Sequence, residues 1–147
     1  MLPRTYEGQD CSLARALEVI GERWSLLIVR SALLGVKRFD GFLGHLPIAR
    51  NVLTNRLARL VDLGIMERVP YQDKPVRHEY PLTPMGRDLT TAVVALMQWG
   101  DRNLPMEAGP PRRAEHLGCD GRVHVRLDCD ECSREVRQEE VAVRRIR

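Results

Sequence analysis

Apolar side chains recur at helical spacing through the first third of the chain. The spacing predicts a first helix between Asp10, which could cap it, and Gly21, which would end it. Its apolar face would consist of Leu13, Ala16, Leu17 and Ile20. A second helix, expected to end at Gly35, would have an apolar face formed by Trp24, Leu27, Ile28 and Ser31. Asp40 would then cap a short third helix that Pro47 closes.

The segment from about Arg50 to Leu63 predicts a helix with two contrasting faces. Its inner stripe would consist of Val52, Leu53, Leu57 and Leu60. Its outer face would carry Arg50, Asn51, Thr54, Asn55 and Arg59. Gly64 supplies a stop signal. A short helix, a tight turn and a helix with a polar face form the order of elements in a helix-turn-helix.

Two strand patterns follow at 65–71 and 77–82, and the residues 72–75 read as the turn between them. A cap and a proline at Thr83 then predict a last long helix that runs to about Asn103. Its apolar side would consist of Leu89, Ala92, Val93, Leu96 and Trp99 or Gly100. The elements together predict a mainly α fold with a small β wing, a winged helix-turn-helix.

Domain organisation follows from where these patterns stop. Residues 1–104 would form the winged helix-turn-helix and dimerisation domain, and the proline- and glycine-rich stretch 105–113 would be a linker. Residues 114–147 would form a small cysteine-containing β/loop appendage, with a candidate strand at 123–127. We expect one domain with an appendage, which suits a chain of 147 residues.

Charge is concentrated on the helix-turn-helix and its wing. Residues 37–77 contain eight basic and four acidic side chains, a net charge of +4 in a chain whose total is +3. No apolar run approaches the ~18 residues that span a membrane, and no signal-peptide core is visible, so we expect a cytoplasmic protein. No glycine-rich phosphate loop, nucleophile elbow or pair of catalytic carboxylates is visible either, which argues against an enzyme.

The outer helix face has the chemistry needed to read DNA, because arginine can bond guanine and asparagine can bond adenine at two points each. The residues expected near base edges are Arg50, Asn51, Thr54 and Asn55. The residues expected to touch phosphate are Arg56, Arg59, Lys37, Arg38, Lys74 and Arg77, with the wing along the minor groove. Two alternatives remain at this stage: a merely solvated helix face, and a winged-helix protein-interaction module that does not bind DNA.

With these residues in view, the chain resembles the HxlR family of bacterial winged-helix regulators, relatives of the MarR group. The resemblance spans Cys11 to about Leu104 and rests on an ordered set of short matches. The matching segments are 11–13, 21–24, 35–39, 52–57, 63–65, 80–83, and single residues Leu60, Arg68, Pro75, Gly86 and Trp99. Relatives commonly have serine at the position of Ala49, where it would cap the recognition helix; alanine should cost about 1 kcal/mol. Either Asn51 caps a later start, or the helix becomes firmer on DNA.

The resemblance implies a homodimeric transcription factor, more often a repressor than an activator. Its first and last long helices would form the two-fold interface, and its two recognition helices would read a pseudo-palindromic double-stranded DNA operator. The resemblance also implies a switch at Cys11, since several family members sense oxidants or electrophiles with a cysteine at this place. A helix amino terminus with Arg15 one turn on favours thiolate. The alternatives are that Cys11 is a small, buried, inert hydrophobic residue, and that a small-molecule effector acts instead.

The appendage contains a metal-ligand pattern, His116-x2-Cys119-x9-Cys129-x2-Cys132. Two pairs at this spacing are typical of a tetrahedral zinc site, and zinc could supply folding energy that so small a segment lacks. Neither second cysteine is followed by the usual glycine, because Asp120 and Ser133 stand there. His124 could replace His116, and a disulfide formed on oxidation or a degenerate site without metal are alternatives.

Overall fold

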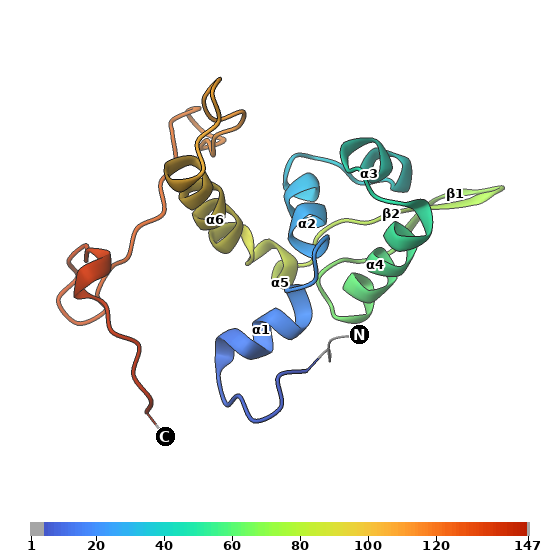
Figure 1. Ribbon diagram of the computed structural model, residues 1–147. Helices are drawn as coiled ribbons and strands as arrows, with labels where there is room; N and C mark the ends of the chain where they lie inside the picture. Colours follow the sequence, from blue (N-terminus) through green and yellow to red (C-terminus); the bar gives the residue numbers. More distant parts are fainter. Residues whose placement is uncertain (1–4, 147) are drawn as a thin grey trace. The chain divides into compact units, whose positions relative to one another are not determined.

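The computed structural model describes residues 5–146, which form two compact units, one up to Val93 and one from Val94. The first unit contains the elements α1 (Ser12–Ile20), α2 (Ser25–Leu33), α3 (Phe39–His45), α4 (Arg50–Asp62), β1 (Val69–Asp73), β2 (Val76–Glu79) and α5 (Pro84–Arg87) (Figure 1). Helix α6 (Thr90–Asn103) begins in the first unit and continues into the second, which also contains the short 3-10 helix η1 (Gln138–Glu140). None of the helices described is both long and apolar enough to cross a membrane.

The core of the first unit lies among α2, α3, α4 and the chain that leaves α4. Its fully buried apolar side chains are Ile28, Val29, Phe42, Leu53, Leu57, Leu60, Ile65 and Met66. The expected inner stripe of α4 is confirmed at Leu53, Leu57 and Leu60, whereas Val52 is only half-buried. Burial of one such side chain contributes about 1.5–3 kcal/mol, so this stripe fixes how α4 is rotated about its own axis.

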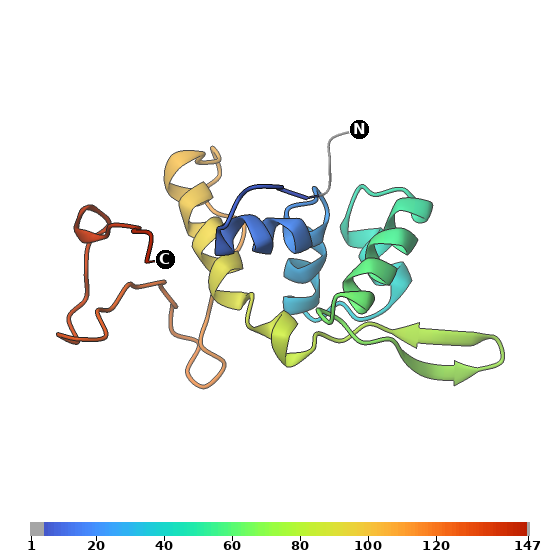
Figure 2. The same ribbon diagram turned by 90° about the horizontal axis from the view of Figure 1, so that it is seen from below.

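The wing is an antiparallel hairpin of β1 and β2, with Asp73 opposite Val76 at its tip and an irregularity between Pro70 and Gln72 (Figure 2). The Gln72 amide closes the turn by donating to the carbonyls of Lys74 and Pro75. These strands are shorter than the sequence pattern suggested, although an isolated bridge between Met66 and Leu82 continues their pairing. The fold is a mainly helical winged helix-turn-helix with a two-strand β-wing.

Two predicted helix caps are wrong. Cys11 rather than Asp10 occupies the N-cap of α1, and it makes no side-chain capping bond. Arg38 rather than Asp40 occupies the N-cap of α3, so Asp40 lies inside the first turn. In each case the helix begins where the backbone leaves the extended region. A nearby aspartate does not determine which residue is the first of the helix. Asp40 still favours α3, because a negative charge near a helix amino terminus is stabilising.

The uncapped start of α4 is confirmed. Ala49 is the N-cap residue, it offers no capping side chain, and the helix begins at Arg50. Asn51 is therefore inside the first turn, which excludes the alternative that it caps a later start. The first amide groups of α4 lack the side-chain acceptor that serine would supply.

The long helix predicted from Thr83 to Asn103 is divided in two. Thr83 does cap α5, since its Oγ1 accepts a hydrogen bond from the amide of Gly86 at 3.1 Å. The helix stops after Arg87, and α6 starts at Thr90, whose hydroxyl donates to the Arg87 carbonyl at 2.6 Å. Gly86 is buried, which shows that α5 packs closely into the first unit.

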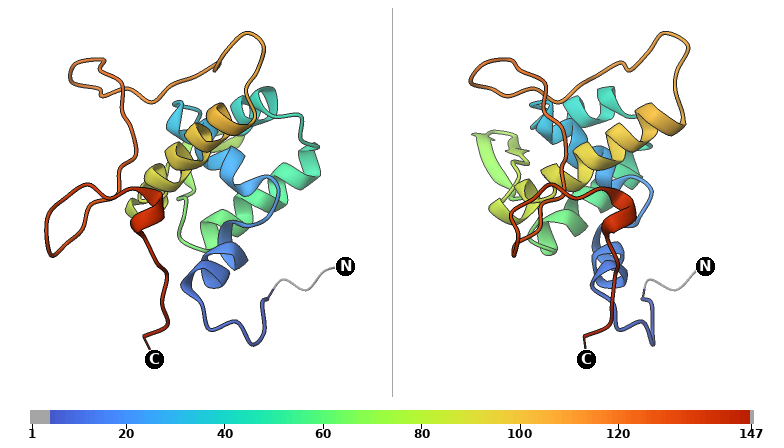
Figure 3. Two further views of the ribbon diagram at one scale, coloured as in Figure 1. Left: turned by 60° about the vertical axis from the view of Figure 1, so that its left-hand side comes forward. Right: turned by 90° about the vertical axis from the view of Figure 1, so that its left-hand side faces the viewer.

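The second unit has little regular structure beyond α6 (Figure 3). The strand expected at 123–127 is wrong, because only the isolated bridges Glu115 to Arg122 and Asp128 to Glu135 form here. The chain at this point is held by α6 instead, through a Gln98 side chain that donates to the Val123 carbonyl and accepts from the Val125 amide. Across residues 94–146 no side chain is buried. The domain boundaries suggested by the sequence stay a prediction.

Candidate nucleic-acid interface

The outward face of α4 carries polar side chains that are free of the core. Asn51, Thr54 and Asn55 are exposed, and they are separated by the three- and four-residue steps that place side chains on one helix face. The Thr54 hydroxyl donates to the carbonyl of Arg50 at 3.0 Å, which leaves the lone pairs of its oxygen available to a donor outside the helix. This face, defined by these three residues, is hereafter the reading face.

Arg50 stands at the first turn of the reading face and is already oriented by α3. Its guanidinium lies over the Phe39 ring, with 5.2 Å from Cζ to the ring centroid, and 3.9 Å from Asp40 Oδ1. Both charged side chains are largely exposed, so the pair adds little stability. The aromatic contact restrains a long side chain at the position where recognition helices meet base edges.

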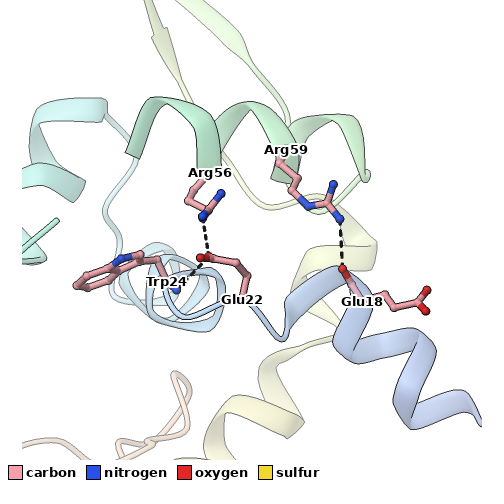
Figure 4. Close-up of polar contacts among 5 residues, drawn as sticks. All are labelled: Glu18, Glu22, Trp24, Arg56 and Arg59. Atoms are coloured by element: carbon pink, nitrogen blue, oxygen red, sulfur yellow. Dashed lines mark hydrogen bonds and ion pairs between the residues drawn. The ribbon is translucent and has the colours of Figure 1, made fainter. Parts of the chain in front are cut away.

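Arg56 and Arg59, by contrast, turn away from the reading face (Figure 4). Arg56 Nε lies 2.5 Å from Glu22 Oε2 as a half-buried ion pair, and the same carboxylate oxygen accepts from the Trp24 amide at 3.2 Å. Arg59 Nη2 donates to the backbone carbonyl of Glu18, in α1, at 3.2 Å. The outward placement of Arg59 was therefore wrong, and both arginines hold α4 against α1 and the loop that follows α1.

A basic groove of about 980 Å³ runs beside the reading face, between α3 and the wing. Its basic lining residues are Lys37, Arg38, Arg50, Arg77, His45 and His78. Arg38 is fixed within it, since its guanidinium lies 4.0 Å from the centroid of the Tyr71 ring and 3.3 Å from Glu79 Oε1. Tyr80 donates its backbone amide to the Lys37 carbonyl at 2.7 Å, which ties the start of α3 to the wing. The groove could accept a phosphate backbone.

The tip of the wing carries Lys74 and Arg77, both exposed. Lys74 lies in the turn, and Arg77 pairs with Gln72 in the register of the hairpin. Positive charges at a projecting hairpin are suited to contacts with phosphate, which position a protein on DNA without reading its sequence.

The cysteines fall in two places. Cys11 is exposed at the N-cap of α1, and its backbone carbonyl accepts from the amide of Arg15 at 3.1 Å. In the second unit, His116 Nδ1 lies 3.3 Å from Cys119 Sγ. The pKa of the Cys129 thiol is lowered by hydrogen bonds from the backbone of Cys132 and Glu131 and from the Cys132 side chain.

The predicted zinc ligands are brought together only in pairs. Within residues 5–146 no three His, Cys, Asp or Glu side chains gather closely enough to hold a metal ion. All four cysteines are free thiols. His116, rather than His124, is the histidine beside a cysteine.

Sequence reasoning missed two groups that shape this interface. Ala58 is exposed one turn beyond Thr54, on the same side of α4, and its small side chain permits close approach of a partner. Its spacing from Thr54 was the available signal. Glu22 was missed because it lies far from α4 in sequence, and only the folded chain, which brings the loop after α1 beside Arg56, reveals their ion pair.

Comparisons with known proteins agree on the class of protein. Residues 19–108 match the HxlR-like helix-turn-helix family. MT3179 of Mycobacterium tuberculosis (strain CDC 1551 / Oshkosh), an uncharacterized HTH-type transcriptional regulator, is 49% identical over 135 residues, covering 92% of this chain and 84% of that protein. The crystal structure of PA1607, a candidate transcription factor, has a TM-score of 0.82 at 34% identity and covers 95% of this chain and 97% of its own. The redox regulator HypR in its reduced form has a TM-score of 0.61 at 34% identity, covering 64% of this chain and 94% of its own. These matches describe DNA-binding transcriptional regulators and not enzymes.

Proposed function

Since the chain belongs to the HxlR-like helix-turn-helix family of DNA-binding transcriptional regulators, we propose that it occupies a pseudo-palindromic operator as a homodimer and represses transcription there. The observation that carries this proposal is the exposed reading face of α4 beside a groove lined by arginine, lysine and histidine. Two such faces, one from each copy, would enter successive major grooves.

The apolar surface of α1 supports a dimer. Leu13 is 65% exposed and Leu17 is 37% exposed, and α1 buries none of its residues. On α6, Leu96 and Trp99 are also more than half exposed, at 54% and 52%. Apolar faces of this kind are normally covered by a partner, and a second copy of the chain would cover them with matching faces. A single winged helix also contacts too few base pairs for useful specificity in a genome.

The dimer is tested by placing charge on α1. We expect the double variant Leu13→Glu/Leu17→Glu to sediment as a monomer and to bind the operator about 100-fold more weakly, because the second half-site is no longer held nearby. Met85→Glu is the matched control, since Met85 is 56% exposed on α5 and lies outside both proposed interface helices. A double variant that remains dimeric at micromolar concentration would contradict the proposed interface.

We further propose that oxidants or electrophiles release the operator by modifying Cys11, with a small-molecule effector as the alternative inducer. HypR, a structural relative, is described as a redox regulator. Cys11 is exposed and begins α1. The Arg59 bond to Glu18 and the Arg56 pair with Glu22 join α1 and its following loop to α4, so a displacement of α1 would reach the reading face.

The response is tested with Cys11→Ser. This variant should bind the operator as the wild type does, but it should keep binding after treatment with diamide or an alkylating reagent. Ser12→Ala is the matched control and should still respond, because it changes the neighbouring exposed residue at the start of α1 and keeps the Cys11 thiol. A wild-type Cys11 that is alkylated at neutral pH no faster than a free small-molecule thiol would exclude the sensor.

A further inference from the structure

The second unit contains two turns with the same backbone geometry. We name residues 114–123 the first knuckle and residues 127–136 the second knuckle. His116 donates its amide to the Gly121 carbonyl at 2.8 Å, and Cys129 donates to the Arg134 carbonyl at 2.9 Å. The pattern extends to both ends of each turn, since the bonds Val123 to Ala114 and Val136 to Leu127 are also equivalent, at 2.9 and 2.8 Å. Two separate segments have therefore folded into one type of turn.

The residue that follows the second candidate ligand has the same backbone conformation in both knuckles. Asp120 has φ 59° and Ser133 has φ 56°, and no other non-glycine residue between 5 and 146 has a positive φ. Each of them donates its amide to the first candidate ligand, Asp120 to the His116 carbonyl and Ser133 to the Cys129 carbonyl, both at 2.8 Å. Glycine usually occupies a position with positive φ, and its absence from these two positions was an argument against a metal site in the sequence analysis. The backbone adopts the required conformation nevertheless.

Each knuckle directs its two candidate ligands toward one point. His116 Nδ1 is 3.3 Å from Cys119 Sγ, and the matching backbone bonds of the second knuckle place Cys129 and Cys132 at the corresponding positions of the same turn. Imidazole nitrogen and thiolate sulfur are the ligands that zinc takes in structural sites, where four of them form a tetrahedron. Each knuckle supplies half of that set.

The second unit also lacks a source of folding energy. No side chain in residues 94–146 is buried, and Leu117, Val143 and Ile146 are 99%, 99% and 96% exposed. A segment of this size without a core usually needs a metal or a partner to become stable. Each knuckle already holds two candidate metal ligands. A metal is therefore a simpler explanation for the stability of this segment than a partner is.

We propose that His116, Cys119, Cys129 and Cys132 of one chain bind a single zinc ion that joins the two knuckles. Binding would bring the pair His116 and Cys119 together with the pair Cys129 and Cys132, with loss of a proton from each cysteine. Residues 124–126 connect the knuckles and would form the bend between them. His116 rather than His124 is assigned as the fourth ligand, because only His116 faces a cysteine sulfur.

The test uses full-length protein purified under reducing conditions without chelator. We expect about one zinc ion per chain by atomic absorption, and cobalt substitution should give the intense visible bands of a tetrahedral sulfur-ligated site. Cys119→Ser, Cys132→Ser and His116→Asn should each lose the metal. Cys11→Ser and His124→Asn are the matched controls and should retain it. A zinc content below about one-tenth equivalent in the wild type, or full retention in Cys119→Ser, would overturn the proposal.

Three further measurements show whether a variant has misfolded, whether the metal is structural, and whether ligands from two chains share one site. The variants should keep the thermal unfolding transition of the first unit, whose core contains none of the four ligands. Limited proteolysis should cut residues 114–136 faster once zinc is chelated, and equal cutting rates would count against a structural metal. Mixing Cys119→Ser with Cys132→Ser chains should not restore binding, and restoration would overturn the assignment to one chain.

Discussion

Replacing Thr54 and Asn55 together with alanine is expected to abolish most of the preference for the operator over unrelated DNA. Both side chains lie on the exposed reading face, where their polar atoms can meet base edges. A well-formed contact to a base is worth about 1 to 3 kcal/mol of discrimination, so two losses should lower the ratio of specific to unspecific affinity by at least about 30-fold. Competition binding with operator and scrambled duplexes measures this ratio directly.

Lys74→Ala is expected to give a contrasting result, because we assign base reading to α4 and phosphate contact to the wing. Lys74 lies in the wing turn and should touch phosphate, so its loss should weaken binding to all sequences alike and should lower the slope of affinity against salt by about one. The two variants must therefore differ both in sequence preference and in salt dependence. If they behaved identically in both assays, the division of roles between α4 and the wing would be wrong.

Gly86→Ala is expected to destabilise the first unit strongly. Gly86 is buried in α5, and a Cβ at this position would overlap the backbone carbonyl oxygen of Ile65, which also accepts the amide of Thr83. Because backbone atoms cannot move as the end of a flexible side chain can, we expect a loss of about 2 to 3 kcal/mol and a Tm lower by about 10 to 15 °C. Thermal unfolding followed by circular dichroism measures the change.

Gly44→Ala is the matched control, because it makes the same substitution in another short helix. Gly44 is exposed in α3, and nothing lies within 4 Å of the Cβ that alanine would add. Alanine should therefore leave stability unchanged or raise it by up to about 1 kcal/mol, since it favours helix over unfolded chain. If Gly86→Ala changed the free energy of unfolding no more than Gly44→Ala does, α5 would not pack against the Ile65 carbonyl.

The sequence was most informative where burial follows a regular period. The three leucines of α4 at positions 53, 57 and 60 lie in the core as their spacing required, and the reading face follows from their burial. Glycine signals were equally clear, because Gly35 and Gly64 have φ values of 96° and 79° in the places where helices were expected to end. Local rules settle such features without knowledge of the rest of the chain.

Features that depend on distant neighbours were not predictable in the same way. The spacing of Arg59 suggested the outer face, but a long side chain can turn, and the carbonyl of Glu18 attracts it toward α1. The helix predicted from Thr83 divides at Asp88 and Leu89, and α5 lies against the backbone carbonyl of Ile65, a neighbour that the helical spacing does not reveal. Whether the two knuckles meet around a metal likewise depends on a ligand that the sequence does not contain.

The chain's asparagines provide the most direct test of the central claim, that the reading face contacts bases. Only three are present: Asn51 and Asn55 on α4, and Asn103 at the end of α6, which serves as an internal control. In protein labelled with 15N-asparagine, operator DNA should shift the side-chain amide signals of Asn51 and Asn55 and give them nuclear Overhauser contacts to base protons, while the Asn103 amide, which donates to the Trp99 carbonyl, stays in place. Saturating DNA that leaves Asn51 and Asn55 unshifted would contradict the account.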